Sequence, residues 1–417
     1  MELVWWPGRS LGSRTLRFGD KGTDVNQLHE FLRLQGYDLG EEEEYGYLTK
    51  DAVRQFQRDH GLVADGIAGK RFFALVLKEN LPIRRRVHVV QPQETLAQIA
   101  QTYGVGVEAF SRSTRKREIY PGQRLVFFDR EVWGRCTNGS KAKAPAQAVT
   151  GVVCVDPSLV SEHLPCVVQP LLNGNADEIQ IHNRLKTPKR RKKTASYLVD
   201  SVPADCGLFL PWKEVPALDG VRYIKLLSKL RNDLPKTSML WVELGPGVPP
   251  WRLSGGVDYA RVNELVDRIV LDLPVPEEPA SLFQRAATEE LLHKILRHVH
   301  SWKILLNVPI YALEWELTSE GTKRAKFPYS TALSRAFRHG ARLKEDEQGE
   351  LFYYYQSKGR HFQIRLPHHA SISQICALAN SYNLAGVILD ELGQEDPRIW
   401  QIIHQHFRTA KLNISAE

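Results

Sequence analysis

The stretch Asp205-Cys206-Gly207-Leu208-Phe209-Leu210-Pro211-Trp212-Lys213-Glu214 decides the fold of the larger part of this chain. Its apolar run at 207–210 predicts a buried strand, and apolar residues at helical spacing between 218 and 234 predict a helix soon after it. A strand, a loop and a helix in this order form the repeating unit of an α/β barrel. In barrel enzymes the residues that directly follow such a strand lie at the catalytic face, where carboxylates are expected. Here those positions carry Pro211 and Lys213.

Length and charge limit the remaining possibilities. The chain has 417 residues, too many for one ordinary core, so two or three domains are expected. It has no apolar run long enough for a membrane span and no basic and apolar start typical of a secretory signal. The net charge of +8 favours a polyanionic partner such as a wall polymer, although the basic runs at 84–86 and 189–193 are more typical of solvated linkers and loops. Without a recognisable binding motif, nucleic acid is not an expected partner.

Cysteine and histidine usage predicts neither a disulfide framework nor a cofactor. The cysteines are few, odd in number and without CxxC spacing. They are Cys136, Cys154, Cys166, Cys206 and Cys376. His368 and His369 are adjacent on an expected loop, and such a pair alone rarely binds a metal, so no metal site is predicted.

Residues 13–80 contain three segments with apolar residues at helical spacing, which predicts a small three-helix bundle with Thr49 as the N-cap of its second helix. Three motifs carry a resemblance to the peptidoglycan-binding domain type 1. They are Leu16-Arg17-x-Gly19-x-x-Gly22-x-Asp24-Val25-x-x-Leu28, Gly46-Tyr47-x-Thr49-x-x-Ala52-Val53-x-x-Phe56-Gln57 and Gly61-Leu62-x-x-Asp65-Gly66-Ile67-x-Gly69. The resemblance implies affinity for peptidoglycan, which the four glutamates at 41–44 would weaken by repelling an anionic polymer. A module that serves only as a folding unit is the alternative.

The pattern over residues 86–128 predicts a strand, two short helices and a closing strand, a βααβ order. Its motifs are Val89-Val90, Glu94-Thr95-Leu96, Ile99-Ala100, Tyr103-Gly104-Val105 and Ile119-Tyr120-Pro121-Gly122-Gln123-Arg124-Leu125. They are similar to those of the LysM domain, which implies binding of N-acetylglucosamine-containing chains such as peptidoglycan. By this resemblance the glycan-binding residues are Thr95 and Leu96 in one loop, and Ile119, Tyr120, Pro121 and Gly122 in another.

A linker is predicted at 129–148, because this stretch has no helical or strand period and contains a small, polar, proline-interrupted segment. From 149 to 417, strand-like runs alternate with helical patterns, which predicts a (β/α)8, TIM-barrel-like domain. Eight strands are expected, at 150–155, 166–172, 178–181, 207–210, 239–244, 268–273, 303–308 and 386–389. A polar and aromatic stretch at 313–366 predicts an α+β insertion, so the chain as a whole is expected to be multi-domain.

Four stretches in the second half of the third domain carry a further resemblance: 258–271, 303–315, 361–366 with 371–387, and 392–400. They resemble the family-18 glycoside hydrolases, in the branch joined to LysM and peptidoglycan-binding modules in spore-forming bacteria. The resemblance implies hydrolysis assisted by the N-acetyl group of the substrate. It also implies a Glu at the end of the fourth strand as the acid, and an Asp two residues earlier that orients the acetamide.

The positions that this resemblance assigns to catalysis carry other residues. Aligned on the glycine of the motif Asp-Gly-x-x-x-Asp-x-Glu, the first Asp is Cys206, the assisting Asp is Pro211 and the acid is Lys213. Lysine has an ordinary pKa of about 10.4 and donates a proton poorly at neutral pH, and proline does not ionise. Shifting the register by one residue makes Glu214 the acid but places Trp212 where the assisting Asp belongs.

Two other parts of the expected site also differ. The Met-x-Tyr-Asp motif after the sixth strand is Asp-Leu-Pro-Val at 272–275, and the Trp of the eighth strand is Asp390. Asp272, Asp390 and Glu391 are nonetheless expected at the barrel mouth, close to Lys213 and Glu243. Such a group could bind a cation or transfer protons, or could form an inert set of salt bridges.

The altered positions predict that the chain is not an enzyme but a cell-wall-binding protein of the spore envelope, with two glycan-binding modules and an inactive hydrolase-like barrel. Its expected partners are peptidoglycan or another N-acetylglucosamine-containing glycan, and other spore-envelope proteins. One alternative is a divergent peptidoglycan or N-acetylglucosaminide hydrolase that uses Glu214, or Asp272, Asp390 and Glu391. A protein-interaction scaffold is the other. The expected location is the spore envelope or cell wall without a signal peptide, with the cytoplasm as the alternative.

Overall fold

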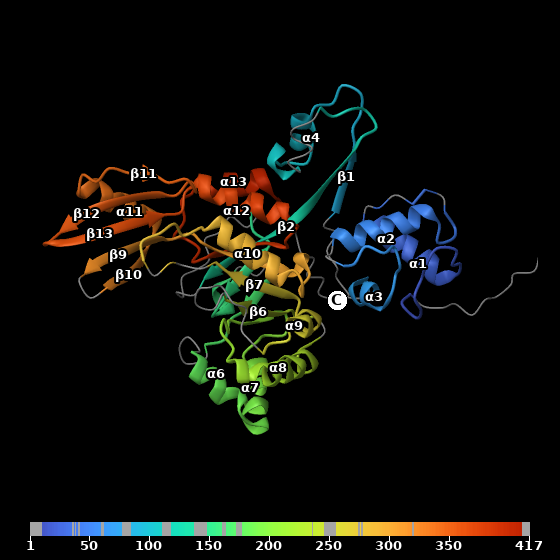
Figure 1. Ribbon diagram of the computed structural model, residues 1–417, viewed down its shortest axis with the longest axis horizontal. Coiled ribbons are helices and arrows are strands. Elements are labelled where there is room, and N and C mark those ends of the chain that lie inside the picture. The colour runs from blue at the N-terminus through green and yellow to red at the C-terminus, as the bar shows by residue number, and fades with distance from the viewer. Residues whose placement is uncertain are drawn as a thin grey trace, which may run out of the picture. The chain divides into compact units, whose positions relative to one another are not determined.

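The computed structural model divides into two compact units, residues 1–129 with 300–302 and residues 130–299 with 303–417, each of which is described by itself (Figure 1). The structure describes residues 11–35, 37, 39–40, 42–59, 62–76, 85–110, 118–136, 148–160, 164–171, 177–235, 237–245, 256–273, 276, 278–318 and 321–410. Among these residues no helix has the length and apolar character needed to span a membrane.

The first domain is a bundle of three helices: α1 (Thr23–Leu34), α2 (Tyr47–Asp59) and α3 (Lys70–Val76). Apolar side chains from all three helices form one buried core, in which the rings of Phe56 and Phe72 lie 4.9 Å apart. The three-helix prediction is therefore confirmed, because the apolar spacing places one face of each helix in a shared core.

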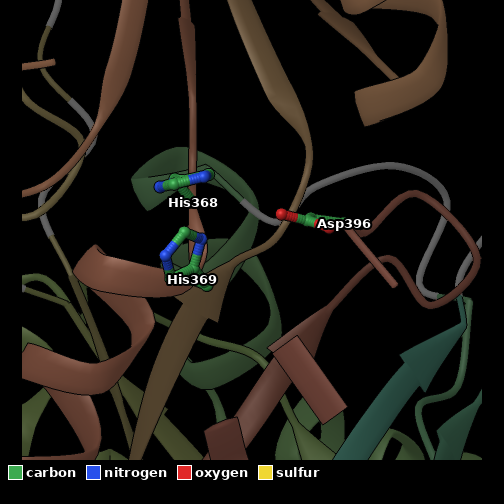
Figure 2. A group of neighbouring side chains, drawn as sticks. All are labelled: His368, His369 and Asp396. Atoms are coloured by element: carbon green, nitrogen blue, oxygen red, sulfur yellow. The ribbon is translucent and has the colours of Figure 1, made fainter. Parts of the chain in front are cut away.

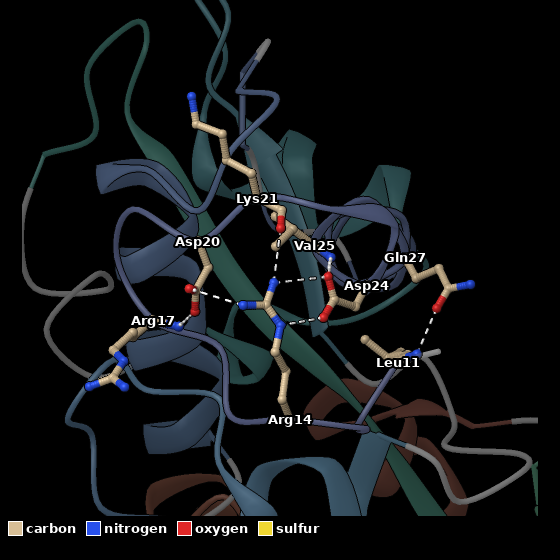
Figure 3. Close-up of polar contacts among 8 residues, drawn as sticks. All are labelled: Leu11, Arg14, Arg17, Asp20, Lys21, Asp24, Val25 and Gln27. Carbon is tan, nitrogen blue, oxygen red and sulfur yellow. Dashed lines mark hydrogen bonds and ion pairs between the residues drawn. The ribbon is translucent and has the colours of Figure 1, made fainter. Parts of the chain in front are cut away.

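The turn before α1 is organised by the side chain of Arg14 (Figure 3). Its guanidinium donates to Asp24 at 2.7 Å, to Asp20 at 3.2 Å and to the carbonyl of Lys21 at 2.9 Å. Burial raises the pKa of Asp24, but the bonds from Arg14 and from the Val25 N–H outweigh it, so the net pKa is lowered. The carboxylate thus stays charged at the start of α1, where the helix dipole favours a negative charge.

Helix α2 begins at Tyr47, so the prediction that Thr49 is its N-cap is wrong. The carboxylate of Glu42 takes this role, since it accepts bonds from the N–H groups of Leu48 at 3.0 Å and Thr49 at 2.9 Å. The free N–H groups of a first helical turn need such an acceptor. One of the four glutamates expected to repel an anionic polymer therefore stabilises the fold of the domain.

The second domain has the predicted βααβ order. It consists of β1 (Arg85–Val89), α4 (Leu96–Thr102), a single 3-10 turn (Val107–Ala109) and β2 (Arg124–Cys136). Strand β1 pairs antiparallel with residues 124–128 of β2. Apolar side chains of α4, the 3-10 turn and β2 form a small core together with Val90, which directly follows β1.

The second unit contains a closed barrel of eight parallel strands. In barrel order they are β2, β3 (Gly151–Cys154), β4 (Cys166–Val168), β5 (Gly207–Leu210), β6 (Leu240–Leu244), β7 (Arg268–Asp272), β8 (Ile304–Pro309) and β14 (Gly386–Asp390). Each strand pairs with the next, and β14 pairs back with β2, which closes the barrel. The described helices of the barrel are α6 (Glu178–Leu185), α7 (Pro188–Asp200), α8 (Gly220–Asp233), α9 (Tyr259–Leu265), α10 (Arg285–Ile295), α12 (His369–Ser381) and α13 (Ile399–His406).

One apolar side chain from each strand fills the barrel interior. These are Trp133, Val153, Val167, Phe209, Trp241, Val270, Leu305 and Ile388. Because successive residues of a strand point to opposite faces, the outward-facing neighbours pack instead against the surrounding helices. For the same reason, the residue two positions further along each strand points inward again at the carboxyl end of the barrel.

Two predictions about the barrel strands are wrong. Residues 178–181 form the first turn of α6 rather than a strand, because Asp177 caps the helix by accepting the Gln180 N–H at 2.7 Å. The strand that completes the set of eight is instead the second half of β2, at 130–136, inside the stretch predicted as a linker. Glu131 and Arg135 are buried there, which breaks the apolar pattern that a strand prediction depends on. Residues 137–147 of the predicted linker lie outside the described residues.

The predicted α+β insertion lies between β8 and β14. It is an antiparallel sheet in the order β10-β9-β13-β12-β11, with helix α11 (Tyr329–Arg338). Its strands are β9 (Ala312–Thr318), β10 (Gly321–Phe327), β11 (Lys344–Glu345), β12 (Leu351–Ser357) and β13 (Arg360–Leu366). Figure 1 shows this sheet extending away from the barrel strands as a separate layer.

Candidate functional site

Charged and polar side chains converge at the carboxyl ends of the barrel strands, the face at which barrel enzymes hold their reactive groups. All of these positions except that of Lys213 follow the apolar interior layer by two residues on their strands. We call Arg135, Lys213, Glu243, Asp272, Asn307 and Asp390 the mouth cluster.

Lys213 enters the mouth cluster from the loop after β5. Its ammonium forms an ion pair with Asp272 and lies 3.9 Å from Oε1 of Glu243. Burial alone would lower the pKa of Lys213. The negative charges of Glu243 and Asp272 have the larger effect, and the net pKa is raised to about 12. Lys213 therefore keeps its positive charge at neutral pH and serves as a counter-ion. Its predicted place near Glu243 and Asp272 is what the structure shows.

Glu243 is the most enclosed carboxyl of the mouth cluster, with an exposed fraction of 0%. Its Oε1 lies 3.3 Å from Nη1 of Arg135, which is also 3.8 Å from Oδ1 of Asp390. Its Oε2 has no hydrogen-bond partner among the described residues. Burial raises the pKa of Glu243, and the nearby charges of Lys213 and Arg135 only partly offset this rise. The carboxyl therefore retains a proton at higher pH than an ordinary glutamate does.

The other carboxylates of the cluster are held by side chains from β8 and from the insertion. Asp272 accepts a bond from Nδ2 of Asn307 at 2.7 Å, and Asp390 lies 4.0 Å from Nζ of Lys326. That ammonium also lies 4.1 Å from the ring centre of Tyr311. Burial, together with the charges of Asp390 and Asp272, raises the pKa of Tyr311 above its ordinary value, so its hydroxyl stays neutral.

In the βααβ domain, the two segments predicted to bind glycan are joined through Val90. Its N–H donates to the carbonyl of Gln123 at 2.9 Å, and its carbonyl accepts the N–H of Gly122 at 2.8 Å. The other predicted segment begins five residues after Val90, at Thr95, which is the N-cap of α4. The Thr95 N–H donates to Oε1 of Gln98 at 2.8 Å, and the Gln98 N–H donates to Thr95 Oγ1 at 3.2 Å. The Thr95 hydroxyl is therefore engaged in the helix cap.

The side chains of these two segments differ in what they offer a ligand. Leu96 and Ile119 pack partly against the core of the domain. Thr95, Pro121 and Gly122 are exposed. Tyr120 is 64% exposed and is the member of the predicted set that presents an aromatic face.

Comparisons with known families agree with the two small folds. A family model described as "Putative peptidoglycan binding domain" matches residues 21–75, and the LysM domain model matches residues 88–128. The chain carries a peptidoglycan-binding domain and a LysM domain. Both resemblances inferred from the sequence motifs are thereby confirmed.

Solved structures identify the fold of the larger domain. The spore cortex-lytic enzyme SleL of Bacillus megaterium QM B1551 is 16% identical with a TM-score of 0.59, over 78% of this chain and 87% of that one. A glycoside hydrolase family 18 N-acetylglucosaminidase from Paenibacillus barengoltzii is 16% identical with a TM-score of 0.53, over 67% of this chain and 100% of that one. The chain thus joins two cell-wall-binding domains to a barrel with the family-18 glycoside hydrolase fold.

A curated relative is named "Putative sporulation-specific glycosylase YdhD", from Bacillus subtilis (strain 168). It is 21% identical over 230 residues, which cover 52% of this chain and 54% of the relative. The present chain therefore spans about half the length of that relative.

These relatives contradict the prediction that the chain is not an enzyme. That prediction depended on altered residues in three parts of the expected site, whereas the barrels that share the fold are named as a cortex-lytic enzyme and an N-acetylglucosaminidase. The curated relative is likewise named as a glycosylase. The interpretation as an inactive barrel is accordingly withdrawn.

The structure brings together only some of the predicted barrel residues. Asp272 and Asp390 belong to the mouth cluster with Lys213, whereas Glu214 takes part in none of the described hydrogen bonds or ion pairs of that cluster. Glu391 directly follows Asp390 and has a left-handed backbone φ of 67°.

The sequence analysis did not assign Arg135, Asn307, Tyr311 or Lys326 to the site. Arg135 lay in a stretch taken for a linker, and Tyr311 lies just beyond the end of β8. The signal for a mouth residue is a charged side chain within an apolar strand, as at Glu243 in Leu-Trp-Val-Glu-Leu.

Proposed function

We propose that this chain binds peptidoglycan or another N-acetylglucosamine-containing glycan of the spore envelope through its LysM and peptidoglycan-binding domains, and hydrolyses that glycan at the mouth cluster. The observation that carries the proposal is Glu243, a fully buried carboxyl with a raised pKa at the carboxyl end of a barrel strand.

Hydrolysis of a glycosidic bond needs an acid that protonates the leaving oxygen. An ordinary glutamate has lost its proton at neutral pH, whereas burial favours the protonated form of Glu243. Its Oε2 has no partner among the described residues, so a proton on this atom is available for donation. Asp272 and Asp390 are paired with Lys213 and Arg135 in the free protein, and in this proposal Asp272 stabilises the positive charge that develops on the sugar ring once the Lys213 side chain turns away.

Lys213 controls access to Glu243. Its ammonium lies 3.9 Å from the Glu243 carboxyl, and its side chain is 46% exposed, so it can turn toward solvent. Since Glu243 itself is not exposed, a glycan reaches it when the Lys213 side chain moves aside. In this proposal Lys213 pairs with the carboxylates in the free protein and does not donate the proton.

The test is binding and hydrolysis of purified peptidoglycan, followed in one tube by sedimentation of bound protein and release of reducing sugar. We expect the wild type to bind and release sugar. Glu243→Gln should bind equally but release sugar at least about 100-fold more slowly. Glu214→Gln is the matched control, because it removes a nearby carboxyl outside the mouth cluster, and it should behave as the wild type.

The other outcomes are equally informative. Binding without release by the wild type would refute the hydrolytic part of the proposal. Loss of release in Glu214→Gln alone would place the acid at Glu214. Absence of binding would refute the assignment of the two small domains to glycan recognition.

A further inference from the structure

His368, His369 and Asp396 form a compact group that shares no residue with the mouth cluster. The two histidines lie at the start of α12, shortly after the last strand of the insertion, and Asp396 lies in the loop between β14 and α13. One potential ligand atom from each residue lies within 4.8 Å of the other two. Figure 2 shows the Asp396 carboxylate pointing toward the two rings.

The group contains buried nitrogen atoms without a partner. His368 is 7% exposed and Asp396 is 2% exposed. The Nδ1 atoms of His368 and His369 are both buried, and neither has a hydrogen-bond partner among the described residues. A buried polar atom without a partner is costly, and each such atom in a native protein requires an explanation.

The two imidazole rings supply the kind of ligand atom that a metal ion needs. The Nδ1 atom of each ring is buried and has no partner among the described residues. A neutral imidazole has a free lone pair on one nitrogen, which is the form that binds a metal.

We propose that His368, His369 and Asp396 bind a divalent transition-metal ion, with Zn²⁺ as the first candidate. Two imidazoles and one carboxylate form a ligand set typical of zinc, with a fourth position open to water or another oxygen. Zinc–ligand distances of about 2.0–2.2 Å require the three ligand atoms to move closer together on binding. His369 is only partly buried and can make this adjustment.

Arg398 is the competitor of the proposed ion. Its Nε lies 2.9 Å from Oδ1 and 3.0 Å from Oδ2 of Asp396, and its Nη2 lies 2.8 Å from Oδ2. The backbone N–H of Arg398 also donates to Oδ1 at 3.0 Å. A carboxylate has about four acceptor positions, so a metal ion must displace at least one of these bonds. The Arg398 side chain is 56% exposed and can turn away, but its positive charge opposes a cation. Removal of this charge should therefore strengthen metal binding.

A bound ion would connect two parts of the barrel domain. It would fix the end of the insertion, where β13 leads into α12, to the loop that follows β14. That loop begins directly after Asp390 of the mouth cluster, so the proposed site would hold this side of the mouth in place.

The experiment uses the full-length protein without an affinity tag, stripped of metal by a chelator. Zn²⁺ binding is measured by competition with a chromogenic indicator, and Co²⁺ is added separately because its visible absorption reports its coordination. We expect one tight site in the wild type, more than about tenfold weaker binding in His369→Gln and Asp396→Asn, and tighter binding in Arg398→Ala. His361→Gln, which removes an exposed histidine of β13, is the matched control and should bind as the wild type does.

Two results would overturn the proposal. One is the absence of a stoichiometric site in the wild type. The other is binding that His369→Gln and Arg398→Ala leave unchanged, which would assign the metal to other residues. Because both of these side chains are at least partly exposed, the comparison remains decisive even if Asp396→Asn does not fold.

Discussion

A buried ion pair joins β2 to β7 inside the barrel, and its loss is expected to destabilise the barrel strongly. Nε of Arg268 lies 2.9 Å from Oε2 and 3.1 Å from Oε1 of Glu131, and its Nη2 also bonds Oε1. The Trp133 indole N–H donates to the same carboxylate at 3.0 Å. Glu131 is 0% exposed and Arg268 is 5% exposed. The perturbation is Arg268→Met, which keeps most of the volume and removes the charge.

The size of the effect follows from this burial. Removing one partner of a buried ion pair costs about 3–5 kcal/mol, because the other charge remains in a poorly solvated place. For a domain of this size, that cost corresponds to a fall in Tm of about 6–20 °C. The double variant Glu131→Gln with Arg268→Met removes both charges, and it should lie within about 2 kcal/mol of the wild type.

The assay is urea unfolding followed by tryptophan fluorescence, since Trp133 and Trp241 lie in the barrel interior. Arg261→Met is the matched control, because Arg261 is 49% exposed and pairs with Glu264 at the surface, so its loss should cost at most about 1 kcal/mol. A cost below about 1 kcal/mol for Arg268→Met would refute the reasoning. So would a double variant as unstable as the single one, because the stranded charge would then not be the cause.

Three further predictions concern packing, pH and binding. Gly386→Ala should cost about 1–3 kcal/mol or more in thermal unfolding, because a Cβ there would lie 1.8 Å from the Glu131 carbonyl oxygen; an unchanged Tm would contradict this packing. Burial raises the pKa of Glu350 from 4.5 to about 7, so between these pH values the unfolded chain releases a proton that the folded protein keeps, and stability falls as pH rises. The stability of Glu350→Gln relative to wild type should therefore increase by up to about 3 kcal/mol from pH 4.5 to 7, and a constant difference would argue against the raised pKa. Tyr120→Ala should weaken peptidoglycan binding roughly tenfold without a change in Tm, because this exposed ring lies in the LysM loop; equal binding in a pull-down would exclude a role for it.

Much of the barrel could be predicted from continuous apolar runs. The strands at 207–210 and 386–389 were found because both of their faces are buried, one against helices and one in the interior, so nearly every residue is apolar. Strand β2 was missed because its inward-facing positions carry Glu131 and Arg135, whose charges are neutralised only by partners distant in the sequence. The segment at 178–181 was mistaken for a strand because a short apolar run does not reveal the cap that Asp177 supplies.

The candidate site was predicted in part. Because parallel strands end at one face of a barrel, Asp272, Asp390 and Lys213 could be expected to meet there, and the structure places them in one cluster. The sequence did not show which carboxyl holds a proton. That property of Glu243 arises from its complete burial on β6, beside Arg135 and Lys213, which no local pattern records.

The order of the domains and the βααβ and barrel folds could be predicted from the sequence, because apolar spacing, turn residues and motifs are local properties of the chain. Three features became visible only in the folded protein: the place of β2 in the barrel, the capping of α2 by Glu42 rather than Thr49, and the grouping of His368, His369 and Asp396. Each of these depends on contacts between side chains and backbone groups that meet only when the chain is folded. Such energies arise only when the chain has folded, and so they leave no periodic signal in the sequence.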